Sequence, residues 1–74
     1  MIIMKNKKIQ IYINGKKKII NVNYNLINIL EDFSLKNKII AIELNKEVVP
    51  KSKYKTKKIK QNDRIEILEL IGGG

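Results

Sequence analysis

With 74 residues, the chain has room for one small domain with a core of minimal size, so a large catalytic cleft is not expected. It contains no cysteine and no histidine, which excludes thiol nucleophiles, imidazole bases, Cys/His zinc sites and disulfides. The formal net charge is +9, but fifteen of the sixteen basic residues are lysines and the other is Arg64. Because phosphate and base-edge recognition favours arginine, we interpret most of this charge as solvated surface and do not expect nucleic acid as the partner.

The first two elements form a predicted β-hairpin. Residues 9–14 alternate between apolar and polar side chains, as a half-buried strand does. The pair Asn14-Gly15 predicts a type I′ turn, because both central residues of that turn need a positive φ. A second strand is expected at 18–22, with Ile20 and Val22 on its inner face.

A short helix is expected next, with Asn23 or Asn25 as its N-cap. Four apolar residues fall at i, i+3, i+4 and i+7 on one stripe: Leu26, Ile29, Leu30 and Phe33. Such a helix of about two turns is stable only when this stripe packs against a sheet. Asn37 is expected to end it in the left-handed conformation.

Two further strands follow the helix. Residues 39–44 are apolar on both faces apart from Glu43, which predicts an interior position in the sheet. Val48-Val49 is expected to form a short extended piece, and Pro50 prevents further pairing on that side.

The last part of the chain is predicted to be a loop, a turn and a strand. Residues 51–58 hold five lysines and Tyr54 and are expected to form a solvated loop. Asn62-Asp63 predicts a turn, and the final strand is expected at 64–71.

This order of elements predicts an α+β fold, the ubiquitin-like β-grasp, in which one helix packs on one face of a mixed sheet. The first and last strands are then expected to lie side by side in the middle of the sheet. Residues 1–71 form the predicted domain and 72–74 a flexible C-terminal glycine tail, because glycines and chain ends are held least firmly. No apolar run approaches the ~20 residues that span a bilayer, so a cytoplasmic protein is expected.

The last strand also predicts a docking surface. If Ile65 and Ile67 face the helix, alternate side chains lie on the open face of the sheet, and the partner-docking residues are predicted to be Tyr12, Glu66, Leu68, Glu69 and Leu70. The alternative is that these side chains are scattered or covered by residues 1–4. Residues 63–74 carry one arginine against three carboxylates, so a partner that binds this end is expected to be basic.

The residues point to a protein that is acted on by enzymes and has no catalysis of its own. No pair of carboxylates is placed for general acid/base work, no glycine-rich phosphate loop is present, and no metal site is expected. The three terminal glycines can lie extended in a narrow channel and present the Gly74 carboxylate to another protein's active site. The other interpretation of these glycines is a frayed terminus.

Three stretches resemble the ThiS family, the sulfur carriers of thiamine biosynthesis. Residues 45–51, Asn-Lys-Glu-Val-Val-Pro-Lys, resemble its Asn-x-Glu-hydrophobic-Val-Pro-Arg motif. Residues 62–67 resemble its turn into the final strand, and Gly73-Gly74 resembles its diglycine end. Lys51 departs from the usual arginine, and because lysine lacks a bidentate fork, any carboxylate-binding role at this position is in doubt.

The resemblance implies a reaction cycle on Gly74. In this family a ThiF-type enzyme uses ATP and magnesium to adenylate the terminal carboxylate, and sulfur from a cysteine desulfurase persulfide then displaces AMP. The resulting thiocarboxylate gives its sulfur to a ThiG-type thiazole synthase. Gly72 and Gly73 would supply reach and clearance, and the chain itself would bind no cofactor.

Two alternatives remain open at the sequence level. A MoaD-like carrier of molybdopterin synthase shares the fold and the diglycine, but that family usually has a proline-rich approach, which residues 69–71 lack. A small basic RNA-binding domain of TGS type would account for the charge of +9 but leaves the terminal glycines unexplained.

Overall fold

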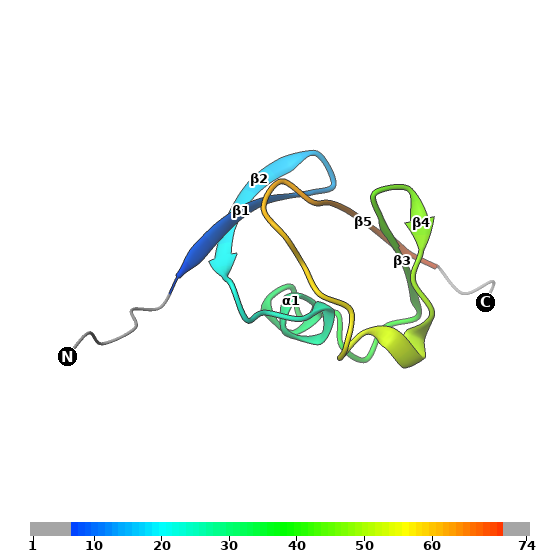
Figure 1. Ribbon diagram of the computed structural model, residues 1–74. Coiled ribbons are helices and arrows are strands. Elements are labelled where there is room, and N and C mark those ends of the chain that lie inside the picture. The colour runs from blue at the N-terminus through cyan, green and yellow to red at the C-terminus, as the bar shows by residue number, and fades with distance from the viewer. Residues whose placement is uncertain (1–6, 71–74) are drawn as a thin grey trace.

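A five-stranded mixed sheet with one α-helix against one face makes up the described part of the computed structural model, residues 7–70 (Figure 1). The elements in chain order are β1 Lys8–Ile13, β2 Lys16–Asn21, α1 Leu26–Asp32, β3 Ile40–Leu44, β4 Glu47–Val48, the 3₁₀ helix η1 Lys51–Lys53, and β5 Arg64–Glu69. The sheet order is β2-β1-β5-β3-β4, with β1 parallel to β5 and the other pairs antiparallel. The β-grasp prediction is confirmed, with the first and last strands adjacent in the middle of the sheet.

The first hairpin closes through the predicted type I′ turn. Asn14 has a φ of 51° and Gly15 a φ of 84°, so both central residues are left-handed as this turn requires. Ile20 is buried, but the prediction that Val22 lies on the inner face is wrong, because β2 ends at Asn21 and Val22 is exposed. The Tyr24 N–H already donates to the Asn21 carbonyl, which turns the chain away from the sheet.

Asn25 is the helix N-cap, in a reciprocal capping box with Asn28. The Oδ1 atom of Asn25 accepts from the Asn28 N–H at 2.9 Å, and Asn28 Oδ1 accepts from the Asn25 N–H at 2.9 Å. Three residues of the predicted stripe, Leu26, Ile29 and Leu30, are buried as expected.

The end of α1 differs from the prediction. Ser34, not Asn37, takes the left-handed conformation, with a φ of 58°. The Ser34 N–H donates to Glu31 O and the Leu35 N–H donates to Leu30 O, which completes a Schellman motif. Because the helix ends here, Phe33 is the C-cap and is 43% exposed, so the prediction that it continues the buried stripe is wrong.

The lysine-rich segment is anchored to the core and is not simply a solvated loop. Tyr54, at the end of η1, is buried, and so is Ile59 further along. The Leu26 N–H donates to the Tyr54 carbonyl, which ties this segment to the start of α1. Burial raises the pKa of the Tyr54 hydroxyl above its ordinary value. The lysines between these anchors remain exposed.

The core lies between the sheet and α1. Its members come from β1, β2, β3, β5, α1 and the segment from Val49 to Ile59: Ile11, Ile13, Ile20, Leu26, Ile29, Leu30, Ile42, Leu44, Val49, Tyr54, Ile59, Ile65 and Ile67. In residues 7–70, no helix has the length and apolar character needed to cross a membrane.

Candidate functional site

Strand β5 leads toward the C-terminal glycines, and β3 pairs with it along nearly its whole length. Strand β3 pairs with it from Ile65, opposite Leu44, to Glu69, opposite Ile40. The Leu70 N–H continues this pairing by donating to the Ile39 carbonyl at 2.8 Å. The direction in which the chain leaves the sheet is therefore set by β3 as far as Leu70.

Asn45, in the turn between β3 and β4, fixes the start of β5. Its φ is 52°, a conformation that asparagine adopts more readily than most residues. Its Oδ1 accepts from the Arg64 N–H at 2.9 Å, and its Nδ2 donates to Asp63 Oδ1 at 2.9 Å. Asn45 is the first residue of the stretch that resembles the family motif, and this contact gives it a physical role.

Asn14, in the turn between β1 and β2, holds β5 further along. Its main-chain N–H donates to Ile65 O at 2.8 Å, as a parallel strand would. The main chain then turns away from β5 at Gly15, and the side chain of Asn14 makes the next hydrogen bonds to β5. Its Oδ1 accepts from the Ile67 N–H at 2.8 Å, and its Nδ2 donates to Ile67 O at 3.4 Å.

Sequence reasoning missed both of these side-chain roles. The available signal was that each hairpin turn carries asparagine at a left-handed position, where glycine would serve the backbone equally well. An asparagine amide offers a donor and an acceptor that glycine lacks.

Substitution of Asn45 by glycine tests this anchoring. Asn45→Gly keeps the positive φ but removes two hydrogen bonds, and we expect a loss of about 1–3 kcal/mol in unfolding free energy. The matched control is Lys46→Gly, at the next left-handed position, φ 74°, whose side chain makes no hydrogen bond within residues 7–70. Urea unfolding of both variants gives the comparison, and equal losses would refute the role of the Asn45 amide.

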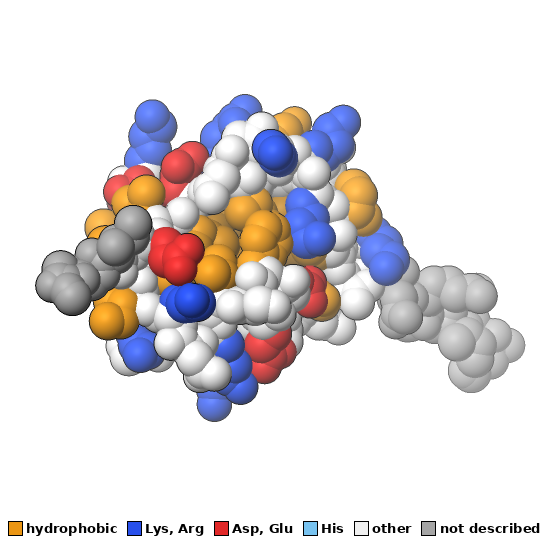
Figure 2. All heavy atoms as spheres, turned by 180° about the vertical axis from the view of Figure 1, so that it is seen from behind, with side chains coloured by type: hydrophobic (Ala, Val, Ile, Leu, Met, Phe, Trp, Pro, Cys, Tyr) orange, Lys and Arg blue, Asp and Glu red, His pale blue; other side chains and the backbone are white. Residues whose placement is uncertain are grey.

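The faces of β5 are as predicted. Ile65 and Ile67 are buried against the helix side, whereas Leu68 and Leu70 are 49% and 50% exposed. Glu66 lies on the same open face, and Glu69 is exposed with its carboxylate 3.9 Å from the Lys38 ammonium. Figure 2 shows hydrophobic side chains gathered in the middle of the back face of the molecule, with charged side chains around them.

The structure does not bring Tyr12 next to the two leucines. Tyr12 pairs with Arg64, and the Arg64 guanidinium carbon lies 4.5 Å from the centre of the Tyr12 ring. Leu68 is four residues further along β5, a separation of about 13 Å at strand spacing. The predicted docking residues other than Tyr12 therefore lie at the end of β5. By alternation along the strand, Glu66, Leu68 and Leu70 are on the open face and Glu69 is on the helix-facing side. Residues 72–74 and 1–4, named as tail and as a possible cover, lie outside the described residues.

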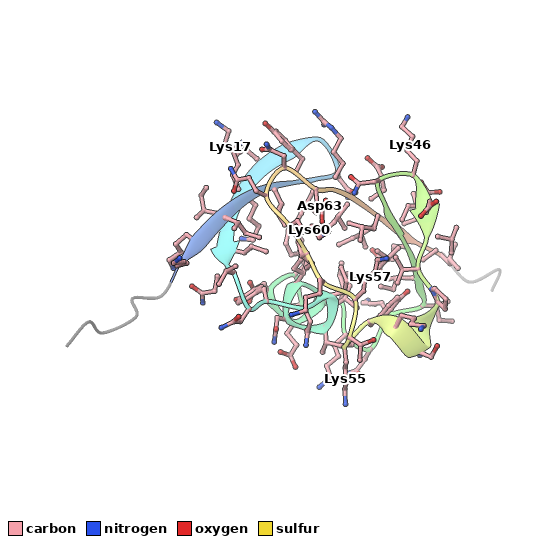
Figure 3. The ribbon with its side chains drawn as sticks, in the orientation of Figure 1. Lys17, Lys46, Lys55, Lys57, Lys60 and Asp63 are labelled. Atoms are coloured by element: carbon pink, nitrogen blue, oxygen red, sulfur yellow. The ribbon has the colours of Figure 1, made fainter. Side chains whose placement is uncertain are left out.

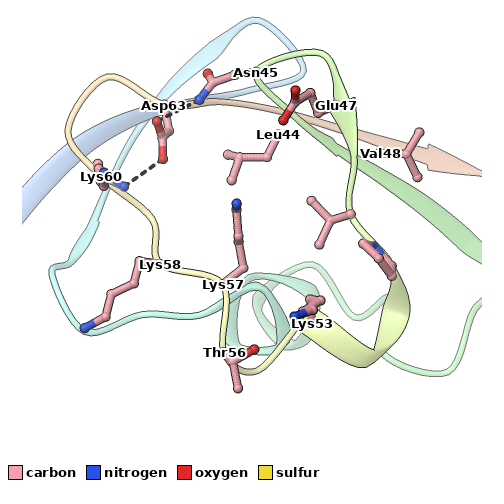
Figure 4. A pocket seen from close by; sticks show the side chains of 12 residues that line it. Leu44, Asn45, Glu47, Val48, Lys53, Thr56, Lys57, Lys58, Lys60 and Asp63 are labelled. Carbon is pink, nitrogen blue, oxygen red and sulfur yellow. Dashed lines mark hydrogen bonds between the residues drawn. The ribbon is translucent and has the colours of Figure 1, made fainter.

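A basic cleft lies between the β3–β4 turn and the lysine-rich segment at 53–60. It has a volume of about 630 Å³ and is lined in part by Lys53, Lys57, Lys58 and Lys60. In Figure 4 Lys57 points into it toward Leu44, whereas Lys58 points away. The carboxylate of Asp63 in its wall is already occupied by the Asn45 amide and the Lys60 N–H.

The lysines labelled in Figure 3 are spread over several elements of residues 7–70 and are not gathered on one. They come from β2, the β3–β4 turn and the segment at 55–60. Lys17 and Lys46 point to the top of the view from its two sides, whereas Lys55 points to the bottom. Among residues 7–70, no group of acidic residues is arranged to hold a metal ion.

Comparison with known proteins places the chain among sequences of one family. The model of the ThiS family matches residues 3–74. The sulfur carrier protein ThiS of Bacillus subtilis is 38% identical over 47 residues, which cover 64% of this chain and 71% of that protein. A thiazole synthase of Paramagnetospirillum magneticum is 31% identical over 65 residues, 88% of this chain, and the chain spans only 20% of that protein.

A solved structure shares the fold. The crystal structure of the thiamine biosynthesis protein ThiS from Geobacter metallireducens superposes with a TM-score of 0.75 at 25% identity, covering 89% of this chain and all of that one. Family match and fold agree over nearly the whole chain. The chain therefore belongs to the ThiS family.

Proposed function

We propose that the chain is a sulfur carrier protein of thiamine biosynthesis whose Gly74 carboxylate is adenylated and then converted to a thiocarboxylate. The observation that carries this proposal is the family match, which extends through Gly74. The Bacillus subtilis relative is named a sulfur carrier protein, and it matches across 71% of its length. The fold supports the same role, because β5 is held by β3 as far as Glu69 and by Asn14 on its other side as far as Ile67, and it leads toward that end of the chain.

The proposed partners are those that the family resemblance implies, and they suit the chemistry of a carboxylate. A carboxylate is a poor electrophile, so a ThiF-type enzyme would use ATP and magnesium to convert it to a mixed anhydride with AMP as leaving group. The outer sulfur of a persulfide formed by a cysteine desulfurase would then displace AMP and give an acyl disulfide. A thiol would cleave the S–S bond of this intermediate, which releases the thiocarboxylate and leaves the thiol in a disulfide. The chain would be the substrate of these steps and not their catalyst. We expect them to take place in the cytoplasm.

The proposed recipient of the sulfur is a ThiG-type thiazole synthase. One relative is named a thiazole synthase, and the similar segment makes up about a fifth of that protein, so a domain like this chain forms part of it. This similarity favours thiazole formation over the molybdopterin alternative.

We assign docking on these partners to the group at the end of β5, namely Glu66, Leu68, Glu69 and Leu70. The two leucines present apolar surface beside the point where the chain leaves the sheet, and exposed apolar surface of this kind marks protein contacts. The carboxylates favour a basic partner surface and would increase the rate of encounter.

Leu68→Glu separates docking from folding. Because Leu68 is half exposed on the open face, we expect little change in unfolding free energy, within about 0.5 kcal/mol, but partner binding weaker by about tenfold or more. The matched control is Ile19→Glu, since Ile19 is 55% exposed on β2 at the far edge of the sheet. Calorimetric titration and thermal unfolding check both, and a large drop in melting temperature for Leu68→Glu would contradict its placement.

Reconstitution tests the proposal as a whole. The purified chain is incubated with the adenylating enzyme, ATP, magnesium, a persulfide donor and a thiol reductant, and its intact mass is measured. The expected gain is the mass difference between sulfur and oxygen, located by fragmentation at Gly74. An unchanged mass in the presence of an active enzyme would contradict a carrier role.

A further inference from the structure

The edge of β5 that faces β1 loses its partner before β5 ends. Main-chain groups of a strand point alternately to its two neighbours. The Leu70 N–H and the Arg64 carbonyl bond to the β3 side, at Ile39 and Asn45. The Ile65 carbonyl and the Ile67 N–H bond to Asn14 on the β1 side. By this alternation, the N–H and the carbonyl of Glu69 point to the β1 side.

Nothing within residues 7–70 pairs with the main chain of Glu69 on that side. Strand β1 ends at Ile13, and the side chain of Asn14 extends its pairing only as far as Ile67.

We propose that this open edge takes a strand from the partner protein, so that an extended segment of the enzyme pairs with the main chain of Glu69. This inference rests on the proposed function and adds the way in which the partner holds the carrier. An unpaired donor and acceptor on a strand edge are a template for strand addition. Leu68 and Leu70 on either side of Glu69 are half exposed and would contact alternate side chains of the added strand.

The charges favour a basic segment of another protein over a second copy of this chain. An antiparallel pairing of two copies at this edge would place Glu69 near its own counterpart, and like charges opposite one another destabilise a strand pair. A lysine or arginine at that position would instead lie beside the carboxylate of Glu69. Within the chain itself, the Lys38 ammonium already lies 3.9 Å from this carboxylate.

Strand addition here would serve the chemistry by fixing register. Glu69 is five residues before Gly74. A partner strand bonded to Glu69 holds the carrier next to the glycines, and the terminal carboxylate then enters the active site from a defined starting point. Ordering the chain before the reaction reduces the entropy that the reactive complex must lose.

Glu69→Pro tests the edge, with Glu69→Ala as its matched control. Proline removes the N–H that points to the open edge and leaves the bonds to β3 intact, because these use Leu68 and Leu70. Alanine removes the same carboxylate but keeps the N–H. We expect the proline variant to bind the adenylating enzyme or the thiazole synthase about tenfold more weakly than the alanine variant, which corresponds to about one lost hydrogen bond.

Hydrogen exchange on the unaltered chain gives a second readout that needs no variant. In the complex the Glu69 amide should exchange at least tenfold more slowly than in the free chain. Equal affinities of the two variants, or unchanged exchange at Glu69 in a saturated complex, would overturn the strand addition while adenylation of Gly74 still proceeds. If the unaltered chain binds neither enzyme and is not adenylated, the proposed function fails and this inference fails with it.

Discussion

A single alanine added after Gly74 is expected to abolish adenylation and thiocarboxylation of the chain. The added residue turns the Gly74 carboxyl group into an amide and moves the free carboxylate about 3.5 Å further along the chain. It also places a Cβ where the proposed channel admits only a bare backbone. Pyrophosphate release and intact mass measure the two steps, and both should fall to background.

The control for this prediction is an alanine added before Met1, which lengthens the chain equally and leaves Gly74 terminal. Both extended chains should unfold at the same temperature as the original, because neither addition touches the core between the sheet and α1. Thiocarboxylation of the C-terminally extended chain at the normal rate would show that the free carboxylate of Gly74 is not the reacting group.

Ile42→Ala is expected to cause a large loss of stability. Ile42 is fully buried in the middle of β3, opposite Ile67. Truncation of a buried isoleucine to alanine costs about 2–5 kcal/mol through lost burial and the cavity left behind. A chain of this length has only about 4–11 kcal/mol in total. The variant should therefore be partly unfolded at physiological temperature, as measured by urea and thermal unfolding.

Val48→Ala is the matched control, because Val48 lies on the neighbouring strand opposite Glu43 and is 70% exposed. Its truncation should change the unfolding free energy by no more than about 0.5 kcal/mol. Similar losses for both variants would contradict the assignment of the core to the helix side of the sheet.

Local periodicity was enough to predict most of the fold. The alternation at 9–14 and 64–71 identified the faces of β1 and β5 correctly, and Asn14-Gly15 predicted the turn that the structure contains. These features depend on neighbours in sequence, and the buried faces of Ile65 and Ile67 follow from a period of two.

Two errors have different causes. Phe33 has the spacing of a buried helix residue, but a local C-terminal motif, with the Ser34 N–H bonded back to Glu31, ends the helix at Asp32. Tyr54 lies among lysines in sequence, yet it packs into the core because the segment after η1 crosses the start of α1. The burial of Tyr54 is not visible in a local pattern, since it depends on which distant element is close by.

The candidate site was predictable only in part. The phase of β5 placed Leu68 and Leu70 on the open face, as the structure does. The separation of Tyr12 from them depends on the register of β1 against β5, which alternation leaves undetermined. The same register leaves the main chain of Glu69 unpaired within residues 7–70, so the proposed edge for strand addition could not be inferred from the sequence.

The most direct measurement follows a labelled sulfur atom. The chain is thiocarboxylated with isotopically labelled sulfur, purified, and given to the thiazole synthase with its other substrates. We predict that the label appears in the thiazole ring and that the chain returns with an unmodified Gly74 carboxylate. A thiazole synthase that is active with another carrier but takes no label from this chain would contradict the account, and transfer to molybdopterin synthase would assign the chain to the other pathway.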